Sequence, residues 1–322
     1  MSPLPLLVTD TFWELAGEEA RQLVPRVEPV LLGPDRQLDL DVLGRVEIAC
    51  LSGDAYPTRV RALMGACARA ENLRWLHSFS AGVDSPAFTA VLERGVRLTN
   101  SSGASAPSIA RTVTMYLLAL SRDLPAWTAA QRERRWAPRR YEELIGQRLL
   151  MVGWGPIGQE TARLAEALGL EVEICRRAAD GTEPYPVRPL AGLRDALVTA
   201  DWVVVALPLT PDTRGLFGVE EFAAMRRGAR LVNVGRGELI DEPALVSALA
   251  TGHLGGAALD VFATEPLPET SELWAMPNVI ITPHASGITD RTDARGRAIF
   301  LDNLERYAAG TPLRNEVRLP SR

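Results

Sequence analysis

A glycine-rich turn constrains what this chain can fold into more than any other feature. Its glycines, Gly153, Gly155 and Gly158, follow an apolar run over 148–152 and precede residues 159–168, whose apolar spacing predicts a helix. Between a strand and a helix, the first glycine permits a tight turn, the second lets backbone approach a pyrophosphate, and the third allows close packing. The helix N-terminus adds unpaired N–H groups and a positive dipole end. The pattern predicts a dinucleotide site, with an ordinary strand–helix turn as the alternative.

The composition is that of a globular protein with room for two domains. The chain has 322 residues, of which 47% are hydrophobic and 23% are charged. A net charge of −5 argues against a nucleic-acid surface, and no apolar run is long enough to span a membrane. The first residues lack the basic region of a signal peptide, and three cysteines without a C-x-x-C pair fit a reducing compartment. We therefore expect a cytoplasmic protein with neither a nucleic acid nor a membrane as partner.

Missing residue types exclude several chemistries. All 35 basic residues are arginine, so the chain has neither a Schiff-base lysine nor the phosphate-binding lysine of a Walker motif. None of the three histidines forms a pair at metal-ligand spacing, so we predict no metal. A hydrolase is disfavoured because the sequence contains no G-x-S-x-G nucleophile turn.

Short apolar runs alternate with helical stretches, which predicts an α/β protein with parallel sheets covered by helices on both faces. The predicted strands are 4–8, 29–32, 46–50, 73–79, 96–99, 148–152, 170–175, 200–206, 230–234, 256–260 and 279–282. The predicted helices include 13–23, 58–69, 86–94, 107–120 and 290–309, and the tail over 313–317 could return to the first domain.

A small, polar linker at 101–106 divides this pattern into two domains. The dinucleotide-binding domain, 102–288, is then an insertion in a substrate domain built from 1–101 and 289–322. Two of the predicted helices cross between the domains. The cleft between them is the default place for an active site.

The end of the second strand after the glycine turn indicates which nucleotide binds. An acidic residue there would bind the ribose 2′-hydroxyl of NAD. Here Arg176 and Arg177 take that position, and a guanidinium pairs with a phosphate and not with a diol. We therefore predict NADP as the preferred cofactor, with NAD possible. The alternative is that both arginines are surface charges and that Asp180 swings in.

Three residues just past predicted strands carry groups suited to carbonyl reduction: Arg236, Glu265 and His284. Ligands of open α/β sheets bind at this strand edge. Reduction requires an acid that protonates the carbonyl oxygen and a cation that holds a carboxylate, and a glutamate beside the imidazole would orient it. A catalytic role is disfavoured for His77 and His253, which lie in a strand-like and a turn-like run.

Several short motifs follow one another along the chain, and their combination is more specific than any one of them. They are 80–84 (Ser-Ala-Gly-Val-Asp), the glycine turn, 207–216 (Leu-Pro-Leu-Thr-Pro-Asp-Thr-Arg-Gly-Leu), 232–237 with Asp241 and Ala244-Leu245, 260–262 with 265–267, and Pro283-His284. With these motifs, nearly the whole chain resembles the D-isomer-specific 2-hydroxyacid dehydrogenases. The resemblance implies two doubly wound parallel-sheet domains, a Rossmann nucleotide domain inserted into a flavodoxin-like substrate domain. It also implies reduction of a 2-ketoacid to the D-2-hydroxyacid. The arginine pair resembles that of the NADPH-preferring glyoxylate and hydroxypyruvate reductases of the family.

The resemblance implies a role for each matching residue. His284 would be the general acid/base paired to Glu265, and Arg236 would bind the substrate carboxylate and carbonyl oxygen. The other carboxylate oxygen would be held by backbone N–H groups of Ala81, Gly82 and Val83. Asp260 would contact the nicotinamide end of the cofactor. The cofactor contacts together would be Gly153, Gly155, Pro156, Ile157, Gly158, Arg176, Arg177, Pro208, Thr213, Val234 and Asp260.

The resemblance also bears on assembly and on the substrate. Residues 121–146 are rich in arginine and tryptophan and poor in periodicity, which predicts an extended arm. Because the family is usually dimeric through its nucleotide domains, this stretch would be a dimer arm; a surface loop is the alternative. Arg111 stands in the hinge helix where the family often has a glutamate. Small polar loops at 51–54 and 78–81 favour a small substrate such as glyoxylate or hydroxypyruvate. A cofactor-sensing regulator without turnover is the competing function, and the combination of arginine, glutamate and histidine favours turnover.

Overall fold

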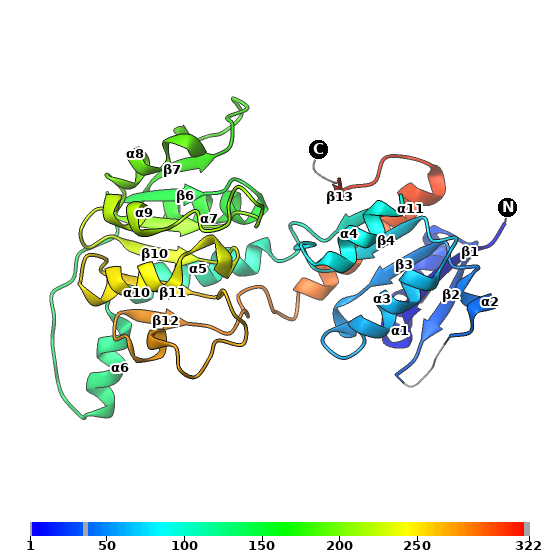
Figure 1. The fold of residues 1–322 in the computed structure, drawn as a ribbon, viewed down its shortest axis with the longest axis horizontal. Coiled ribbons are helices and arrows are strands. Elements are labelled where there is room, and N and C mark those ends of the chain that lie inside the picture. Colours follow the sequence, from blue (N-terminus) through cyan, green and yellow to red (C-terminus); the bar gives the residue numbers. More distant parts are fainter. Residues whose placement is uncertain (1, 35–37, 319–322) are drawn as a thin grey trace. The chain divides into compact units, whose positions relative to one another are not determined.

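The structure is a computed structural model that describes residues 2–34 and 38–318 of the chain. It divides into two compact units, one running up to Ser105 and resuming at Thr289, the other running from Ala106 to Ile288. Each unit is built around its own sheet (Figure 1). The chain therefore leaves the first unit once and returns to it once.

Within the described residues, the first unit has a six-stranded sheet in the order β13-β5-β4-β3-β1-β2. Its strands are β1 (Leu4–Thr9), β2 (Val27–Leu32), β3 (Ile48–Leu51), β4 (Trp75–Ser78), β5 (Arg97–Asn100) and β13 (Glu316–Val317). Its helices are α1 (Asp10–Leu23), α2 (Leu40–Leu43), α3 (Val60–Arg69), α4 (Pro86–Glu93) and α11 (Thr292–Ala309), with a 3-10 turn η1 (Gly53–Ala55). Strands β1 to β5 pair in parallel in the flavodoxin-like order 2-1-3-4-5, and β13 pairs antiparallel to β5.

Side chains alternate between the two faces of this sheet, and a different set of helices covers each face. Leu7 and Leu76 pack with α2, α3 and α4 in one core cluster. Leu6 and Trp75, one residue away, pack with α1 and α11 on the other face. Because such strands are buried on both faces, they are continuous apolar runs in the sequence, which is why their positions were predictable.

The second unit has a seven-stranded, parallel sheet in the order β12-β11-β10-β9-β6-β7-β8. Its strands are β6 (Arg148–Val152), β7 (Glu171–Arg176), β8 (Val187–Pro189), β9 (Trp202–Val205), β10 (Arg230–Asn233), β11 (Gly256–Leu259) and β12 (Val279–Ile281). Its helices are α5 (Ala106–Ser121), α6 (Leu124–Arg132), α7 (Pro156–Ala167), α8 (Leu193–Leu197), α9 (Val219–Ala224) and α10 (Glu242–Ala250), with 3-10 turns η2 (Leu190–Gly192), η3 (Gly237–Leu239) and η4 (Glu272–Ala275). Counted from β6 this is the Rossmann order with one additional strand. Helices α5 and α7 cover one face, and α8, α9 and α10 cover the other (Figure 1).

The stretch predicted as an extended arm begins with a helix instead. Helix α6 follows Asp123, carries Pro125 in its first turn, and spaces Leu124, Trp127 and Ala130 three residues apart. Of these three only Ala130 is buried, and polar residues fill the positions after it, so the helical period was too short to recognise. The chain over 133–147 forms neither helix nor strand. Helix α6 lies outside the layers formed by the sheet and its covering helices (Figure 1).

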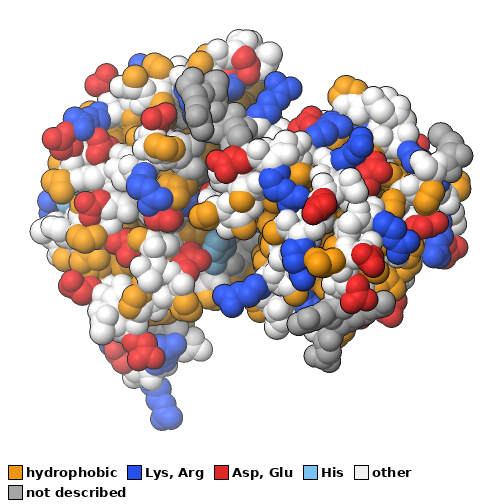
Figure 2. Space-filling model, turned by 45° about the vertical axis from the view of Figure 1, so that its right-hand side comes forward, with side chains coloured by type: hydrophobic (Ala, Val, Ile, Leu, Met, Phe, Trp, Pro, Cys, Tyr) orange, Lys and Arg blue, Asp and Glu red, His pale blue; other side chains and the backbone are white. Residues whose placement is uncertain are grey.

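The remaining expectations concern the surface and the cysteines. No helix in the described part of the chain is long and apolar enough to cross a membrane. Arginine and acidic side chains are interspersed over the face shown in Figure 2. All three cysteines are buried and unpaired, and burial raises the pKa of Cys67 and of Cys175 to about 12. These two thiols therefore stay protonated and unreactive.

Candidate active site

The turn between β6 and α7 is shaped by its three glycines. Gly153 has φ +110°, which L side chains rarely adopt, and an added Cβ would lie 2.5 Å from the backbone oxygen of Ala206. An added Cβ on Gly158 would lie 2.2 Å from the oxygen of Gly153. At Gly155, the N-cap of α7, an added Cβ would meet nothing within 4 Å. The turn is thus packed against the protein at its first and third glycines and open at its second.

The N-terminus of α7 fits the phosphates of a dinucleotide. Gly155 provides no side-chain cap, Pro156 occupies the first turn, and that turn contains no acidic residue. The first N–H groups of the helix and its positive dipole end are therefore not compensated by a side chain of the turn. Ile157 is partly buried against the core of the unit. The residues present can accept a pyrophosphate on backbone N–H groups.

Arg176 is the last residue of β7 and lies next to the glycine turn. Cys175 is paired with Val152, and the N–H of Gly153 donates to the oxygen of Cys175 at 2.8 Å. Nη1 of Arg176 donates to Oδ2 of Asp180 at 2.9 Å, and the same guanidinium pairs with Glu183. The structure thus places the predicted arginine at the expected strand end, but holds it in an ion-pair cluster.

Pro208 and Thr213 belong to the loop after β9, the neighbour of β6 on its other side. The Thr213 hydroxyl donates to the oxygen of Pro208 at 2.8 Å and accepts from the N–H of Thr210 at 2.8 Å. Thr213 is buried, as is Val234 just after β10, whereas Pro208 is exposed. Thr213 shapes the loop from within, and its contact with a cofactor stays a prediction.

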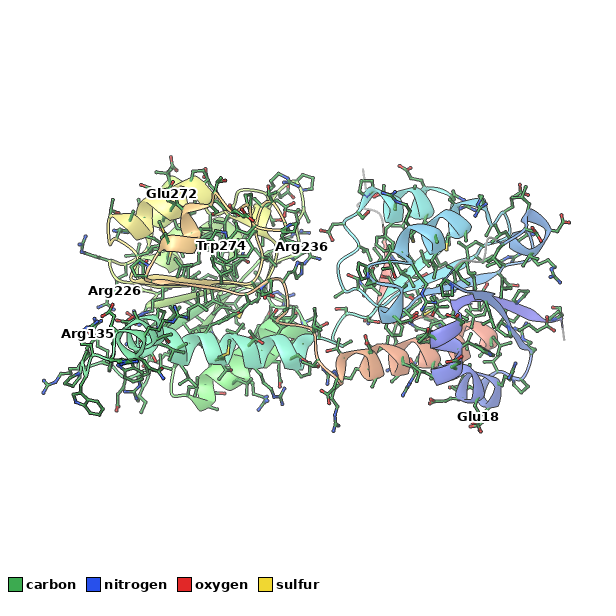
Figure 3. The ribbon with its side chains drawn as sticks, turned by 90° about the horizontal axis from the view of Figure 1, so that it is seen from below. Glu18, Arg135, Arg226, Arg236, Glu272 and Trp274 are labelled. Carbon is green, nitrogen blue, oxygen red and sulfur yellow. The ribbon has the colours of Figure 1, made fainter. Side chains whose placement is uncertain are left out.

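Arg236 lies in a turn that is fixed on both sides. The Asn233 side chain donates to the oxygen of Arg236 at 2.9 Å and accepts from the N–H of Gly235 at 3.0 Å. An added Cβ on Gly237 would lie 1.8 Å from the carbonyl carbon of Phe262, so only glycine allows this turn to contact the loop after β11. In Figure 3, Arg236 lies at the opposite end of the unit from Arg226, which precedes β10. Arg236 is therefore at the carboxyl edge of the sheet.

His284 and Glu265 form a hydrogen-bonded pair at that edge. Nδ1 of His284 lies 2.7 Å from Oε2 of Glu265, and Oε1 of Glu265 accepts from the N–H of Phe262 at 3.0 Å. The side chains are 51% and 35% exposed, respectively. The two residues follow the neighbouring strands β12 and β11, and Arg236 follows the next strand, β10. The structure thus brings the three predicted residues to one edge of one sheet.

The other two histidines make internal contacts. His77 is buried in β4, with its ring nitrogens 2.8 Å from the Thr99 hydroxyl and 3.1 Å from the Ser101 hydroxyl. Burial lowers the pKa of His77 to about 3, so it is neutral. Nε2 of His253 contacts two backbone oxygens at the end of α9. Both histidines are structural.

The segment 81–83 belongs to the first unit and follows β4 at the carboxyl edge of that sheet. Asn100, at the end of the adjacent strand β5, donates its side-chain amide to the oxygen of Ala81 at 2.8 Å. The segment is not in helix or strand. Its backbone is thus positioned by the neighbouring strand end, and its binding of a substrate stays a prediction.

Residues 114–286 match the family model for the NAD-binding domain of the D-isomer specific 2-hydroxyacid dehydrogenases. The match covers more than half of the chain. The chain belongs to this family. The matched model is that of an NAD-binding domain, and the open glycine turn lies within the matched residues.

Solved structures of the family match the chain over nearly its whole length. A D-isomer specific 2-hydroxyacid dehydrogenase from Xanthobacter autotrophicus Py2, in complex with NADPH and MES, is 31% identical with a TM-score of 0.81, covering 99% of this chain and 98% of that one. An NADPH-dependent glyoxylate/hydroxypyruvate reductase from Sinorhizobium meliloti, in complex with NADP and sulfate, is 28% identical with a TM-score of 0.78 and 98% of each chain covered.

Curated relatives include enzymes of another name and greater length. The D-3-phosphoglycerate dehydrogenase of Methanocaldococcus jannaschii is 33% identical over 264 residues, which are 79% of this chain and 49% of that protein. The chain thus spans about half the length of the D-3-phosphoglycerate dehydrogenases that it matches. The similar proteins thus share the family and carry the names of different substrates.

Within this family fold, the loop that carries His284 is held by Asp260. The carboxylate of Asp260 is buried and accepts from the Thr282 hydroxyl at 2.6 Å, the N–H of Ala285 at 2.9 Å and the N–H of Ser286 at 3.1 Å. These bonds bracket His284, whose φ of +50° is uncommon for a residue other than glycine. Asp260 therefore positions the histidine loop, and its contact with the nicotinamide stays a prediction.

Tyr116 on α5 extends this network and was not predicted as a site residue. Its hydroxyl hydrogen-bonds to Thr282, and burial raises the pKa of Tyr116 to about 12. The hydroxyl thus stays protonated and fixes the start of the histidine loop. In the sequence the tyrosine occupies one position of an apolar helical stripe, and nothing there distinguishes it from a core residue.

A cavity of about 630 Å³ adjoins the His284–Glu265 pair and was also missed. It is lined by Phe262, Glu265, Pro266, Leu267, Trp274, Ile281, Pro283 and His284. Trp274 comes from η4 (Figure 3) and donates its indole N–H to the oxygen of Pro268 at 3.0 Å. An isolated tryptophan in a loop carries no pattern that would assign it to a pocket.

Proposed function

We propose that the chain reduces a small 2-ketoacid of the glyoxylate or hydroxypyruvate kind to the D-2-hydroxyacid, with NADPH as the preferred cofactor and NADH as a possible one. The hydrogen bond between His284 and Glu265, at the sheet edge that also carries Arg236, is the observation that carries the proposal. Family membership supports the reaction class. The likeness to the reductase from Sinorhizobium meliloti supports the cofactor and the size of the substrate.

The cofactor, when bound, supplies the hydride that reduces the substrate carbon. His284 donates a proton to the carbonyl oxygen, and it does so from Nε2 because Nδ1 faces Glu265. The Glu265 carboxylate orients the imidazole through its bond to Nδ1. Arg236 binds the substrate carboxylate as a bidentate donor.

The two units take different parts in this proposal. The second unit binds the cofactor through the glycine turn, Arg176 and Arg177, and the loops that contain Pro208 and Val234. The first unit is the substrate domain, with the backbone N–H groups of 81–83 as its carboxylate ligands. The structure supports the cofactor part through the open N-terminus of α7.

A histidine variant tests the proposed function. His284→Ala should lower kcat by roughly 10²–10⁴-fold, which is the usual contribution of a positioned acid, while Kd for NADPH stays unchanged. His253→Asn is the control, because that ring contacts only backbone oxygens at the end of α9 in the described structure. Steady-state rates with a panel of 2-ketoacids and both cofactors give kcat for the wild type and for each variant. Near-normal turnover in His284→Ala, or NADPH binding without turnover of any ketoacid, would contradict it; the second outcome would indicate a cofactor-sensing regulator.

We also propose that the chain forms a homodimer through the second unit. An apolar groove of about 590 Å³ between α5 and α6 is lined by Met115, Leu118, Leu124 and Trp127 among others. These four side chains are large, hydrophobic and exposed, a pattern that marks interaction surfaces. Trp127→Glu should shift the chain from dimer to monomer in analytical ultracentrifugation. A monomeric wild type would contradict the proposal.

A further inference from the structure

The carboxyl end of β7 carries a charged cluster in which two carboxylates contact Arg176. Arg176 donates to Asp180 at 2.9 Å and also pairs with Glu183. The Arg176 side chain is 26% exposed and the Glu183 side chain 2%, so their ion pair is partly buried. Pairs in such a position are screened less by salt than pairs on the open surface. An anion that binds Arg176 must therefore displace these carboxylates from it.

Both carboxylates are fixed by the backbone of the turn 180–183. The N–H groups of Asp180 and Gly181 donate to the Glu183 carboxylate at 3.0 Å each, and the N–H of Thr182 donates to Asp180 at 3.0 Å. The Thr182 hydroxyl lowers the pKa of Asp180 further, and the backbone N–H of Asp180 lowers the pKa of Glu183. The turn thus presents two charged carboxylates to Arg176 in a set geometry.

Arg176 is also a proposed ligand of the 2′-phosphate of NADPH. Both carboxylates are contacted by Nη1 of Arg176, so the two N–H donors of this nitrogen face the turn and cannot bind a phosphate at the same time. We propose that Glu183 and Asp180 are specificity-determining residues that compete with the 2′-phosphate for Arg176. They lower the affinity for NADPH without affecting NADH, so they set the ratio between the two cofactors. This inference rests on the proposed cofactor role of Arg176.

Arg177 is the alternative ligand for the phosphate. Its side chain is exposed, and within residues 2–34 and 38–318 it makes no hydrogen bond or ion pair. If Arg177 alone bound the phosphate, the carboxylates on Arg176 would act only through screened charge and would change the cofactor ratio little. Variants of the turn therefore distinguish the two arginines.

Glu183→Gln and Asp180→Asn test the competition. Asp180→Asn keeps the one oxygen that accepts from the N–H of Thr182, whereas Glu183→Gln keeps one of the two oxygens that accept from the N–H groups of Asp180 and Gly181. Both variants lose the charge, and Asp180→Asn does so with the hydrogen bonds of the turn retained. Glu173→Gln is the matched control: it removes from the same strand a carboxylate that pairs with Arg188 at 2.6 Å. Isothermal titration calorimetry with NADPH and with NADH gives Kd for each variant, and a thermal melt verifies that each is folded.

Glu183→Gln should tighten NADPH binding by about three- to tenfold, the range expected for loss of a partly buried competing ion pair. Asp180→Asn should have a smaller effect because Asp180 is more exposed. NADH binding and the control should stay unchanged. An unchanged NADPH-to-NADH ratio in both turn variants overturns the inference and leaves the cofactor proposal intact. Weaker NADH binding in Asp180→Asn also overturns it, since Asp180 then binds the ribose. A wild-type chain that binds neither nucleotide overturns both proposals.

Discussion

The two units of this protein share a strand–turn–helix arrangement but differ in the turn between the strand and the helix. In each unit a central parallel strand leads into a helix that covers one face of the sheet. After β1 the turn is closed by its own side chains: Thr9 caps α1 by accepting from the N–H of Phe12 at 3.1 Å, and Asp10 in the first helical turn pairs with Arg59. After β6 the turn has no side-chain cap and no acid, and its second glycine faces open space.

This difference shows that a doubly wound sheet does not by itself make a phosphate site. The N-terminus of any helix attracts an anion. In the first unit that anion is the Asp10 carboxylate, whose pKa is lowered mainly by its hydrogen bond from Arg59. In the second unit no residue of the turn takes this place, so the helix can receive a ligand. Variants of the two turns can break or sharpen this contrast.

The largest effect is expected at the packed end of the open turn. Gly158→Ala would place a Cβ 2.2 Å from the backbone oxygen of Gly153, so strand and helix must separate. Overpacking of this kind costs about 3 kcal/mol of unfolding free energy. Urea unfolding of the second unit measures the loss. Stability equal to that of the wild type would mean that the turn is less tightly packed than the structure shows.

The next largest effect is expected at His77. The two sheets also differ in how their histidines are placed. His77 is buried in the first sheet and its pKa is lowered from 6.5 to about 3, whereas His284 is at the edge of the second. As pH falls below 6.5, the unfolded chain binds a proton at residue 77 and the folded chain does not, so stability is lost progressively down to pH 3. Between pH 7 and pH 5 the wild type should lose about 2 kcal/mol through His77 alone.

Urea unfolding of the wild type and of His77→Gln at pH 7 and pH 5 measures the loss of unfolding free energy that is due to His77. The variant should lack that part of the pH dependence, while carboxylates elsewhere contribute equally to both proteins. Equal slopes of stability against pH for the variant and the wild type would show that His77 is not held neutral by burial.

The chain order of most strands could be predicted, although the short strand β8 was missed. The position of Arg236, Glu265 and His284 at one sheet edge could also be predicted, because each follows a strand that is a distinct apolar run. What could not be predicted depends on contacts between segments far apart in sequence. The hydrogen bond between Tyr116 and Thr282 joins a residue on α5 to a residue after β12, and the sequence near either residue contains no pattern that predicts it. The ion pair between Glu183 and Arg176 could not be predicted either, because Glu183 lies in the turn after β7 and no pattern in the sequence links the two side chains.

A smaller effect is expected at the open glycine of the second unit. In Gly155→Ala the Cβ meets no protein atom within 4 Å and the backbone φ of −79° suits alanine, so stability should stay within about 1 kcal/mol of the wild type. The methyl group occupies the space through which a pyrophosphate approaches the helix, so Kd for NADPH should rise roughly tenfold. Calorimetric titration checks the affinity. Unchanged affinity would show that the phosphates do not bind over this residue.

The smallest effect is expected at the matching position of the first unit. Thr9→Ala removes the hydroxyl that caps α1 and leaves the pair between Asp10 and Arg59 in place. Loss of an N-cap costs about 1 kcal/mol, which urea unfolding of the first unit can measure. Affinity for NADPH should not change, because this helix end is compensated by its own carboxylate. A measurable affinity of Thr9→Ala for phosphate or NADPH would be the contrary result. That outcome would show that the side-chain cap alone keeps anions from the N-terminus of α1, and that the Asp10 carboxylate contributes little to their exclusion.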